Sequence, residues 1–417
     1  MKLFKNNKTD QPMEKTLITE ESQMDDKIKI EVREKKSFNV EEFKTEEEKQ
    51  RERVQKILND SFISQYFNDD GITDISFNGT ALWLQHNQNG RYLADKQPSI
   101  DEVTVLVKQI ADIQGKEFNT SQPILDTEIG FLRVNAIHKA ASPDGITFAL
   151  RVSRPKLALT DISSISSKEV EGLLKVLIMS KSNLIISGKT GAGKTEFQKL
   201  LVGFMSEDDK ITLIEDTRDS HIKALYPKND INSWVTLLND SRENKITMEK
   251  EIRAALRNNP DWIMVSEVRG EEAAQMFEAA QTDHSIMTTL HVKEAKRIPD
   301  RLRELLMRSR SWASLPGVMV GKAITDLIKF GAYMKIEKLE DGSYYRYIKE
   351  IVEFTDYTEK GVSCRYLYRK VREVDETGKY YWKETYDTLS DESIQTMKDQ
   401  KVYHLLPDVF KKKILSE

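Results

Sequence analysis

The octapeptide GKTGAGKT, residues 188–195, constrains the fold of this chain more than any other segment. It follows a short apolar run, residues 184–187, and it opens a segment whose apolar residues have helical spacing. The pattern Gly-x4-Gly-Lys-Thr predicts a loop between a buried strand and a helix, in which glycines let backbone N–H groups converge on phosphate oxygens. The alternative is a plain glycine turn, and the flanking strand and helix patterns favour the phosphate loop.

The residues of this loop have separate predicted tasks. Lys194 should reach the β- and γ-phosphates of a nucleotide, and the Thr195 hydroxyl should hold Mg²⁺. The helix that begins at the loop adds the positive end of its dipole. The expected cofactors are therefore ATP and Mg²⁺. The predicted nucleotide-binding residues of the loop are Gly188, Lys189, Thr190, Gly191, Ala192, Gly193, Lys194 and Thr195.

Helix-type and buried-strand-type segments alternate on both sides of the loop, over residues 156–330. The strand-type segments are NLIISG, KITLIED, WIMVSEV and HSIMTTL. The helix-type segments are EGLLKVLIMSKS, KTEFQKLLVGFM, MEKEIRAALRNN and EEAAQMFEAAQ. Such alternation predicts parallel strands joined by crossover helices, which is an α/β fold.

The other parts of the chain have different textures, and 417 residues exceed the usual size of one domain. Residues 1–57 are charged and poor in apolar side chains, which predicts a disordered or helical tail. Residues 58–155 carry strand, turn and helix patterns and predict a small α+β domain. Residues 331–417 are first Tyr-rich and β-like and then helix-like, so we expect a C-terminal appendage without a catalytic cluster.

The composition limits the protein class. The 64 Lys+Arg nearly balance the 68 Asp+Glu, so the formal net charge of -4 gives no bulk attraction to nucleic acid or to an anionic membrane. A single cysteine excludes an internal disulfide framework and fits a reducing cytosol. No apolar run is long enough to span a bilayer, and the N-terminus lacks the apolar core of a signal peptide. We therefore expect a cytoplasmic protein that reaches the membrane's inner face through partners.

Two further predicted strands end in acidic residues. Glu267 follows the apolar run of residues 262–265, and Glu215 with Asp216 follows residues 211–214. Two strand-end carboxylates suit a site in which one positions Mg²⁺ and another polarises the attacking water. The pattern leaves the two roles open, and we favour Glu267 as the base and Mg²⁺ contact, with Glu215 orienting the water. The alternative for Glu267 is a surface glutamate after a core strand.

Histidines bracket the last strand-type segment of the α/β region. His284 precedes it and His291 follows it, after Thr288 and Thr289. A histidine at the end of a core strand has the reach to contact the γ-phosphate, and this is the catalytic role predicted for His291. The alternative is a histidine that only satisfies a local polar contact. With no cysteine or further histidine nearby, a zinc site is not expected.

The order of phosphate loop, IEDTR, PDWIMVSEVRG and TTLH resembles the bacterial type II/type IV secretion ATPase superfamily, and within it the conjugation/type IV secretion and tight-adherence-pilus branch. The segments ITDISFNG, PILDTEIGFLRVNAI and DGITFALRV resemble the N-terminal domain of that family. The resemblance implies a RecA-like P-loop ATPase domain preceded by a smaller, PAS-like α+β domain. It also implies a homo-hexameric ring.

The resemblance further implies nucleotide contacts from the N-terminal domain. The matching positions are Arg133 and Arg151, and cations there would neutralise γ-phosphate charge. Ordinary strand-edge arginines are the alternative. Three positions depart from the family pattern: Ser266 and Asp283 replace glycines, and Asn259 replaces a basic residue. None of the three removes a Mg²⁺ or phosphate ligand, so the resemblance implies an active ATPase.

Our leading interpretation is a Mg²⁺-dependent ATPase that energises conjugation or secretion machinery through its membrane components. The alternatives are a pilus or competence-pseudopilus motor and a nucleotide-gated assembly platform with little turnover. A DNA translocase would need a basic pore, and the near-neutral charge indicates none, so no direct sequence-specific nucleic-acid contact is expected. The transported substrate and the membrane partner stay open.

Overall fold

The computed structural model describes residues 46–67, 69–237 and 245–412. Most of the predicted tail, residues 1–57, therefore lies outside the described residues. The exception is the start of helix α1 (Glu46–Asp60), which covers the end of the predicted tail and buries Leu58 in the first folded part of the chain.

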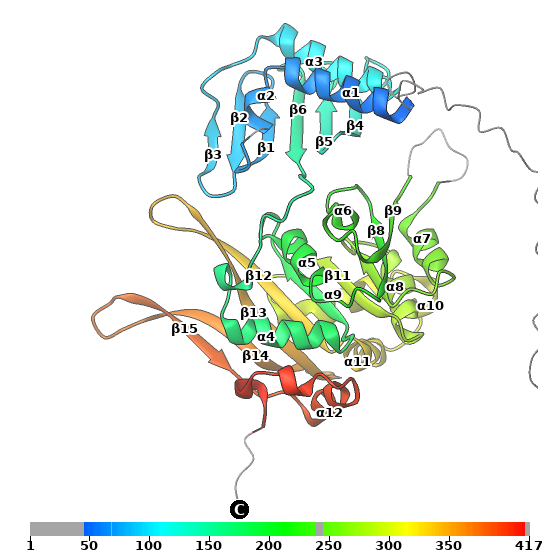
Figure 1. Cartoon of the computed structure of the whole chain (residues 1–417), viewed down its shortest axis with the longest axis vertical. Coiled ribbons are helices and arrows are strands. Elements are labelled where there is room, and N and C mark those ends of the chain that lie inside the picture. The colour runs from blue at the N-terminus through cyan, green and yellow to red at the C-terminus, as the bar shows by residue number, and fades with distance from the viewer. Residues whose placement is uncertain (1–45, 68, 238–244, 413–417) are drawn as a thin grey trace, which may run out of the picture. The chain divides into compact units, whose positions relative to one another are not determined.

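The N-terminal part is a six-stranded antiparallel sheet in the order β3-β2-β1-β6-β5-β4 (Figure 1). Apolar residues alternate along its strands, as half-buried strands require, and they pack with α1 and α3 into one core. The bounds are α2 (Ser64–Phe67), β1 (Ile72–Phe77), β2 (Leu82–His86), β3 (Gly90–Leu93), α3 (Ile100–Ile113), β4 (Ile124–Ile129), β5 (Leu132–Ile137) and β6 (Thr147–Val152).

The second sheet has nine strands in the order β15-β14-β13-β12-β7-β11-β10-β8-β9. From β12 to β9 neighbouring strands are parallel, whereas β12 to β15 form an antiparallel series. The bounds are β7 (Leu184–Gly188), β8 (Lys210–Glu215), β9 (Asp230–Val235), β10 (Trp262–Val265), β11 (Ser285–Leu290), β12 (Phe330–Lys338), β13 (Tyr344–Thr358), β14 (Gly361–Val374) and β15 (Tyr380–Tyr386).

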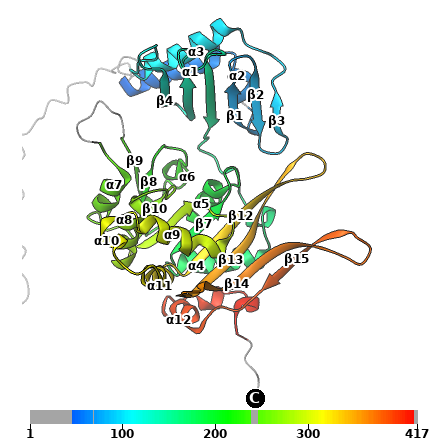
Figure 2. The ribbon, with the colours of Figure 1, turned by 180° about the vertical axis from the view of Figure 1, so that it is seen from behind.

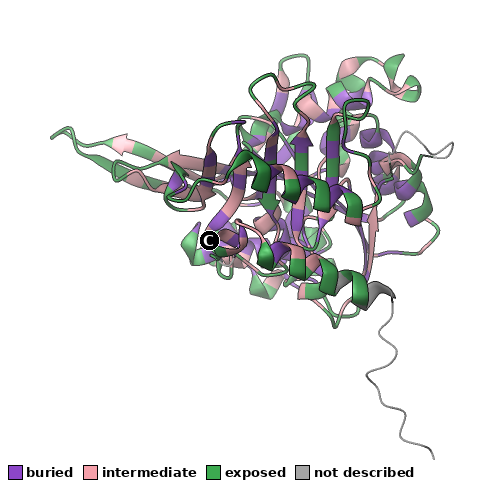
Figure 3. Cartoon of the chain, turned by 90° about the horizontal axis from the view of Figure 1, so that it is seen from above, coloured by how far each residue is buried: buried purple, intermediate pink, exposed green. Residues whose placement is uncertain are grey.

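Helices cover both faces of this sheet. Successive residues of a buried strand point to opposite faces, so each central strand contributes side chains to the core on either side. Leu184 and Ile186 of β7 join the core under α4 and α5, whereas Ile185 joins the core under α7, α8, α9 and α11. Figures 1 and 2 show the two helical layers from opposite sides, and Figure 3 shows buried positions along the central strands. The bounds are α4 (Lys168–Met179), α5 (Lys194–Val202), α6 (Ile222–Leu225), α7 (Met248–Ala255), α8 (Glu272–Gln281), α9 (Ile298–Leu306), α10 (Arg310–Ala313), α11 (Gly317–Leu327) and α12 (Asp391–Asp399).

The C-terminal strands belong to the same sheet as the phosphate loop. β12 pairs in parallel with β7 from Phe330 to Met334, so the expected boundary at residues 330 and 331 falls inside a strand. The nine-stranded sheet thus includes β12 to β15, which lie almost entirely in the residues predicted to form a C-terminal appendage. A Tyr-rich, half-buried texture in the sequence does not reveal that its first strand pairs with a central one.

The carboxyl ends of the parallel strands meet at one edge of the sheet, where open α/β sheets place their ligands. β7 ends at the phosphate loop, β8 ends at Glu215, and β10 and β11 end just before Glu267 and His291. Among the described residues, no helix combines the length and apolar character needed to cross a membrane.

Candidate nucleotide site

The phosphate loop runs from the end of β7 to the first turn of α5. A Cβ added to Gly188 would lie 2.5 Å from the Met334 carbonyl oxygen on β12, so this position requires glycine. Gly193 has a φ of 91° as the residue before α5. In the described part of the chain, the N–H groups of Gly193, Lys194 and Thr195 donate to no acceptor. The loop thus presents free donors at a helix N-terminus, which fits an anionic group.

The Lys194 side chain is folded into this loop. It is buried, and its Nζ lies 3.2 Å from the Gly188 carbonyl oxygen and 3.5 Å from that of Lys189. Burial lowers the pKa of the Lys194 ammonium, and the carboxylate of Glu267 opposes this shift. Among the described residues, the Lys194 ammonium has only these backbone acceptors, so it is poised to bind phosphate oxygens instead.

Thr195, in the first turn of α5, is only partly buried. Its hydroxyl, together with a carboxylate and phosphate oxygens, would provide the oxygen ligands that Mg²⁺ prefers. Among the described residues, no group of three or more acidic, histidine or cysteine side chains is placed to hold a metal ion. Thr195, which follows the loop at the end of β7, and Glu267, which lies just beyond β10, are at the same sheet edge, and their oxygens fit Mg²⁺ shared with a nucleotide.

Glu267 lies just beyond β10. A side-chain nitrogen of another residue lies beside each of its two carboxylate oxygens. Arg269 Nη2 donates to Oε2 at 2.8 Å. His291 Nε2 lies 3.0 Å from Oε1, a distance that fits an ion pair, although the orientation is not that of a hydrogen bond. Burial would raise the pKa of Glu267, but the hydrogen bond and charge of Arg269 hold it below its usual value. Glu267 is therefore ionised at neutral pH.

Glu215, the last residue of β8, has a different environment. It is 1% exposed, and its Oε1 accepts the Ser220 N–H at 3.0 Å, while Oε2 has no partner among the described residues. Burial raises the pKa of Glu215 to about 7. No hydrogen bond joins Glu215 to Glu267 in the described part of the chain, so the predicted pair of strand-end carboxylates shares an edge but not a contact. The water-orienting role of Glu215 stays a prediction.

The two histidines lie at opposite ends of β11. His291 is next to Glu267, as described above, whereas His284 precedes the strand and its Nδ1 lies 3.0 Å from Thr282 Oγ1. The structure therefore brings only His291 to the carboxyl edge. Between them, Thr289 Oγ1 donates to the Ser266 carbonyl at 2.7 Å and ties the end of β11 to that of β10.

The two N-terminal arginines lie opposite each other on β5 and β6. Arg133 Nη1 is 3.8 Å from Asp219 Oδ2, and Arg151 Nε donates to Asp74 Oδ1 at 3.3 Å. Within the described residues, neither arginine has a hydrogen bond or ion pair with residues 188–195. The charge of Arg151 does reach Lys194, whose pKa it helps to lower. Direct phosphate contacts from both arginines stay predictions.

Sequence reasoning missed two arginines at this edge. Arg269 bridges Glu267 and, at 3.0 Å, Asp216, so it joins the two acidic segments. It lies in the quoted segment PDWIMVSEVRG, and its place two residues after Glu267 is a signal that was available. Arg346 on β13 donates from Nε to the Gly191 carbonyl at 2.9 Å. Nothing near Arg346 in the sequence indicates this contact, which depends on the pairing of distant strands.

Two of the three departures from the family pattern have a backbone explanation. Asn259 has a φ of 50° and Asp283 a φ of 66°, in the turns before β10 and β11. Asparagine and aspartate adopt this left-handed conformation more readily than other residues with side chains. Ser266 is different, since its Oγ is buried without a partner in the described part of the chain.

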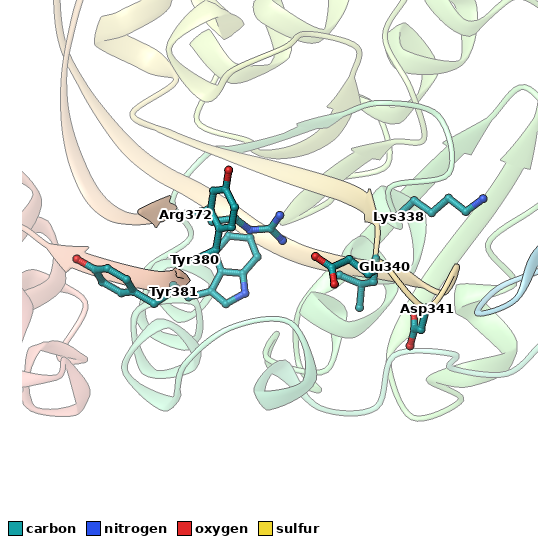
Figure 4. A pocket seen from close by; sticks show the side chains of 8 residues that line it. Lys338, Glu340, Asp341, Arg372, Tyr380 and Tyr381 are labelled. Atoms are coloured by element: carbon teal, nitrogen blue, oxygen red, sulfur yellow. The ribbon is translucent and has the colours of Figure 1, made fainter. Parts of the chain in front are cut away.

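A separate pocket of about 450 Å³ lies where the β12–β13 and β14–β15 hairpins end (Figure 4). Arg372, Tyr380, Tyr381 and Trp382 line it from one hairpin, and residues 338–341 line it from the other. None of the candidate nucleotide-site residues lines this pocket.

The chain is similar to known proteins over most of its length. The sequence model of the family described as "Type II/IV secretion system protein" matches residues 125–401. An uncharacterized protein of Bacillus anthracis is 35% identical over 296 residues, which cover 68% of this chain. The match covers 65% of that relative, which is less than two thirds of its length.

Two solved structures share the fold. The Legionella pneumophila ATPase DotB has a TM-score of 0.52 at 19% identity, over 74% of this chain and 81% of DotB. The pilus retraction motor PilT, solved with bound ADP, has a TM-score of 0.51 at 15% identity, over 82% of this chain and 88% of PilT. At these identities the likeness bears on the fold alone. The predicted fold class, a RecA-like α/β domain preceded by a smaller α+β domain, is confirmed.

Proposed function

Because the chain belongs to the type II/IV secretion system protein family, we propose that it is a Mg²⁺-dependent ATPase and acts as a hexameric ring motor. In this proposal ATP hydrolysis energises a type IV secretion or conjugation machine, whose membrane components the ring meets at the inner face of the cell membrane. The observation that carries the proposal is the convergence of Lys194, Glu267 and His291 beside free loop N–H groups at one sheet edge.

The first part of the mechanism is binding. The loop N–H groups and the Lys194 ammonium take the phosphate oxygens, and Thr195 with Glu267 takes Mg²⁺, partly through water. When bound, Mg²⁺ neutralises charge on the phosphate oxygens. Arg133 and Arg151 add cationic groups from the N-terminal sheet as the domains close over the nucleotide.

The second part is activation of water. Glu267 is ionised, so one of its carboxylate oxygens accepts the proton of the attacking water. Glu215 orients that water, and His291 contacts the γ-phosphate and responds to its loss. Arg269 must release Glu267, at least in part, before the carboxylate can act.

A second candidate function is a nucleotide-gated platform with little turnover. It is favoured by one observation, the contact of Arg269 and His291 with the two oxygens of Glu267. If these contacts persist with nucleotide bound, the carboxylate stays a weak base, and binding without hydrolysis follows.

The test is Mg-ATP hydrolysis by the full chain beside Lys194→Ala and Glu267→Gln, with particle mass from light scattering. We expect turnover in the parent and a loss of about a hundredfold or more in both variants, because one loses a phosphate ligand and the other the base. Lys175→Ala, at an exposed position on α4, is the matched control and should keep parental turnover. A ring-sized mass supports the motor, whereas nucleotide binding without turnover supports the platform.

A further inference from the structure

Arg346 is a cation beside the phosphate loop, and no carboxylate among the described residues forms an ion pair with it. It lies on β13, which is separated from the loop strand β7 by β12 alone (Figure 2). Its Nε donates to the Gly191 carbonyl at 2.9 Å, and in the described part of the chain it forms no ion pair. Partial burial lowers the pKa of Arg346 from its ordinary value, yet an arginine keeps its proton in proteins. A half-buried, unpaired charge needs an explanation.

The same guanidinium has a second backbone partner. Arg346 Nη1 donates to the Asn87 carbonyl at 2.6 Å, in the turn between β2 and β3. The Tyr344 N–H donates to the neighbouring Gln88 carbonyl at 2.9 Å. Arg346 therefore spans two carbonyl groups that are far apart in sequence, one in the phosphate loop and one in the N-terminal sheet.

The side-chain stem of Arg346 also packs on the loop. A Cβ added to Gly193 would lie 3.6 Å from Arg346 Cδ. The stem therefore lies close to Gly193, while the guanidinium holds the loop at the Gly191 carbonyl. Because the peptide unit is planar, fixing the Gly191 carbonyl also fixes the direction of the Ala192 N–H, which donates to the Lys189 carbonyl at 3.1 Å.

We propose that Arg346 is a positioning residue for nucleotide binding, which holds the Gly191–Ala192 peptide so that the N–H groups of residues 193–195 stay directed toward phosphate. This inference rests on the proposed nucleotide site. Arginine suits the task because its planar fork carries donors on separate nitrogens that reach two carbonyls at once. A lysine ammonium at this position has one nitrogen and cannot reproduce both contacts.

The test measures the dissociation constant of a fluorescent ADP analogue, with Mg²⁺, for the full chain and for Arg346→Ala and Arg346→Lys. We expect the dissociation constant to rise about tenfold in Arg346→Ala, as for loss of a charged hydrogen bond. Arg346→Lys should remain weakened by at least about fivefold, because charge alone does not hold the carbonyl. Arg372→Ala removes an arginine of the neighbouring hairpin that pairs with Glu337 at 3.3 Å, and it should bind as the parent does.

Two further readouts separate positioning from a purely structural role. For ATP hydrolysis, KM should rise with the dissociation constant while kcat changes little, and the midpoint of thermal unfolding without nucleotide should stay near the parental value. Parental affinity in Arg346→Ala, or full recovery in Arg346→Lys, would overturn the inference while leaving the proposed ATPase intact. A parent chain that binds no ADP would overturn both. If Arg346→Ala does not fold, Arg346→Lys decides alone, since full parental affinity contradicts the inference.

Discussion

Glu215 and Glu267 are the same amino acid at the same edge of one sheet, yet their neighbours shift their acidity in opposite directions. Glu267 has Arg269 at hydrogen-bond distance, which holds its pKa below the usual value despite burial. Glu215 accepts the Ser220 N–H, and in the described part of the chain it forms no ion pair, so burial outweighs the hydrogen bonds and raises its pKa to about 7. Sites with two carboxylates divide their tasks by such differences in environment. At neutral pH Glu267 carries a charge, and Glu215 is partly protonated.

The raised pKa of Glu215 predicts how stability depends on pH. A carboxyl group whose pKa rises on folding, here from 4.5 to about 7, binds its proton more tightly in the folded state. The contribution of this proton to the free energy of unfolding is fully present below about pH 4.5 and is lost as the pH rises through about 7. Glu215→Gln keeps an acceptor for the Ser220 N–H and cannot ionise. We therefore expect this variant to be more stable than the parent at pH 8, by at most about 3 kcal/mol, and to differ from it by less than about 1 kcal/mol at pH 5.

Thermal or denaturant unfolding of both proteins at pH 5 and pH 8 checks this expectation. Glu249→Gln, in the first turn of α7, is the matched control for the loss of a carboxylate elsewhere in the chain. A Glu215→Gln variant that is less stable than the parent at pH 8 would show that the ionised carboxylate has a compensating partner in solution.

At the scale of elements, local pattern predicted those strands whose burial is continuous. β7, β8, β10 and β11 consist almost entirely of buried residues, and each was expected at its place. β9, with the mixed burial of Asp230–Val235, gave no comparable signal. The pairing of β12 with β7 is a contact between residues far apart in sequence, and no local pattern encodes it.

The candidate site likewise contains residues that local sequence patterns predict and contacts that only the tertiary structure reveals. The loop glycines, Lys194, Glu267 and His291 each sit at the end of a predictable element, so their shared edge followed from the parallel arrangement. The contacts of Arg346 and the bridge from Arg269 to Asp216 depend on side-chain directions and strand register. Such contacts are set by tertiary packing, and sequence spacing alone does not fix them.

The close approach of β7 to β12 predicts an effect of Gly188→Ala. Its Cβ would meet the Met334 carbonyl oxygen at 2.5 Å, and a backbone atom cannot rotate away. The two strands must separate, so we expect a loss of stability of about 2 kcal/mol together with weakened ADP binding. The matched control is Gly342→Ala in the β12–β13 turn, where φ is 84° and nothing lies within 4 Å of the added Cβ. The Gly342→Ala variant should lose about 1 kcal/mol of stability, from backbone strain alone. Equal losses in the two variants, measured by denaturant unfolding, would contradict the argument.

At the scale of the whole molecule, the described residues form three apolar cores, two on the faces of the nine-stranded sheet and one in the N-terminal part. The N-terminal core depends on α1. Leu58 is 1% exposed there, and Val54 and Ile57 pack against the same core from α1. A domain boundary after residue 57 would therefore separate residues of one helix that contact the same core.

This core predicts where the chain can be shortened. Removal of residues 1–45 takes away a segment of low apolar content and leaves Glu46–Asp60, the described span of α1, so the midpoint of thermal unfolding and the proposed ATP turnover should both stay parental, while recruitment to the proposed membrane partners weakens. Leu58→Ala in the full chain should instead lower stability by about 3 kcal/mol, because it leaves a cavity in a buried core. Lys56→Ala, at an exposed position on the same helix, is the matched control. Turnover lost on removal of residues 1–45, with the unfolding midpoint unchanged, would mean that this segment acts in catalysis rather than in recruitment.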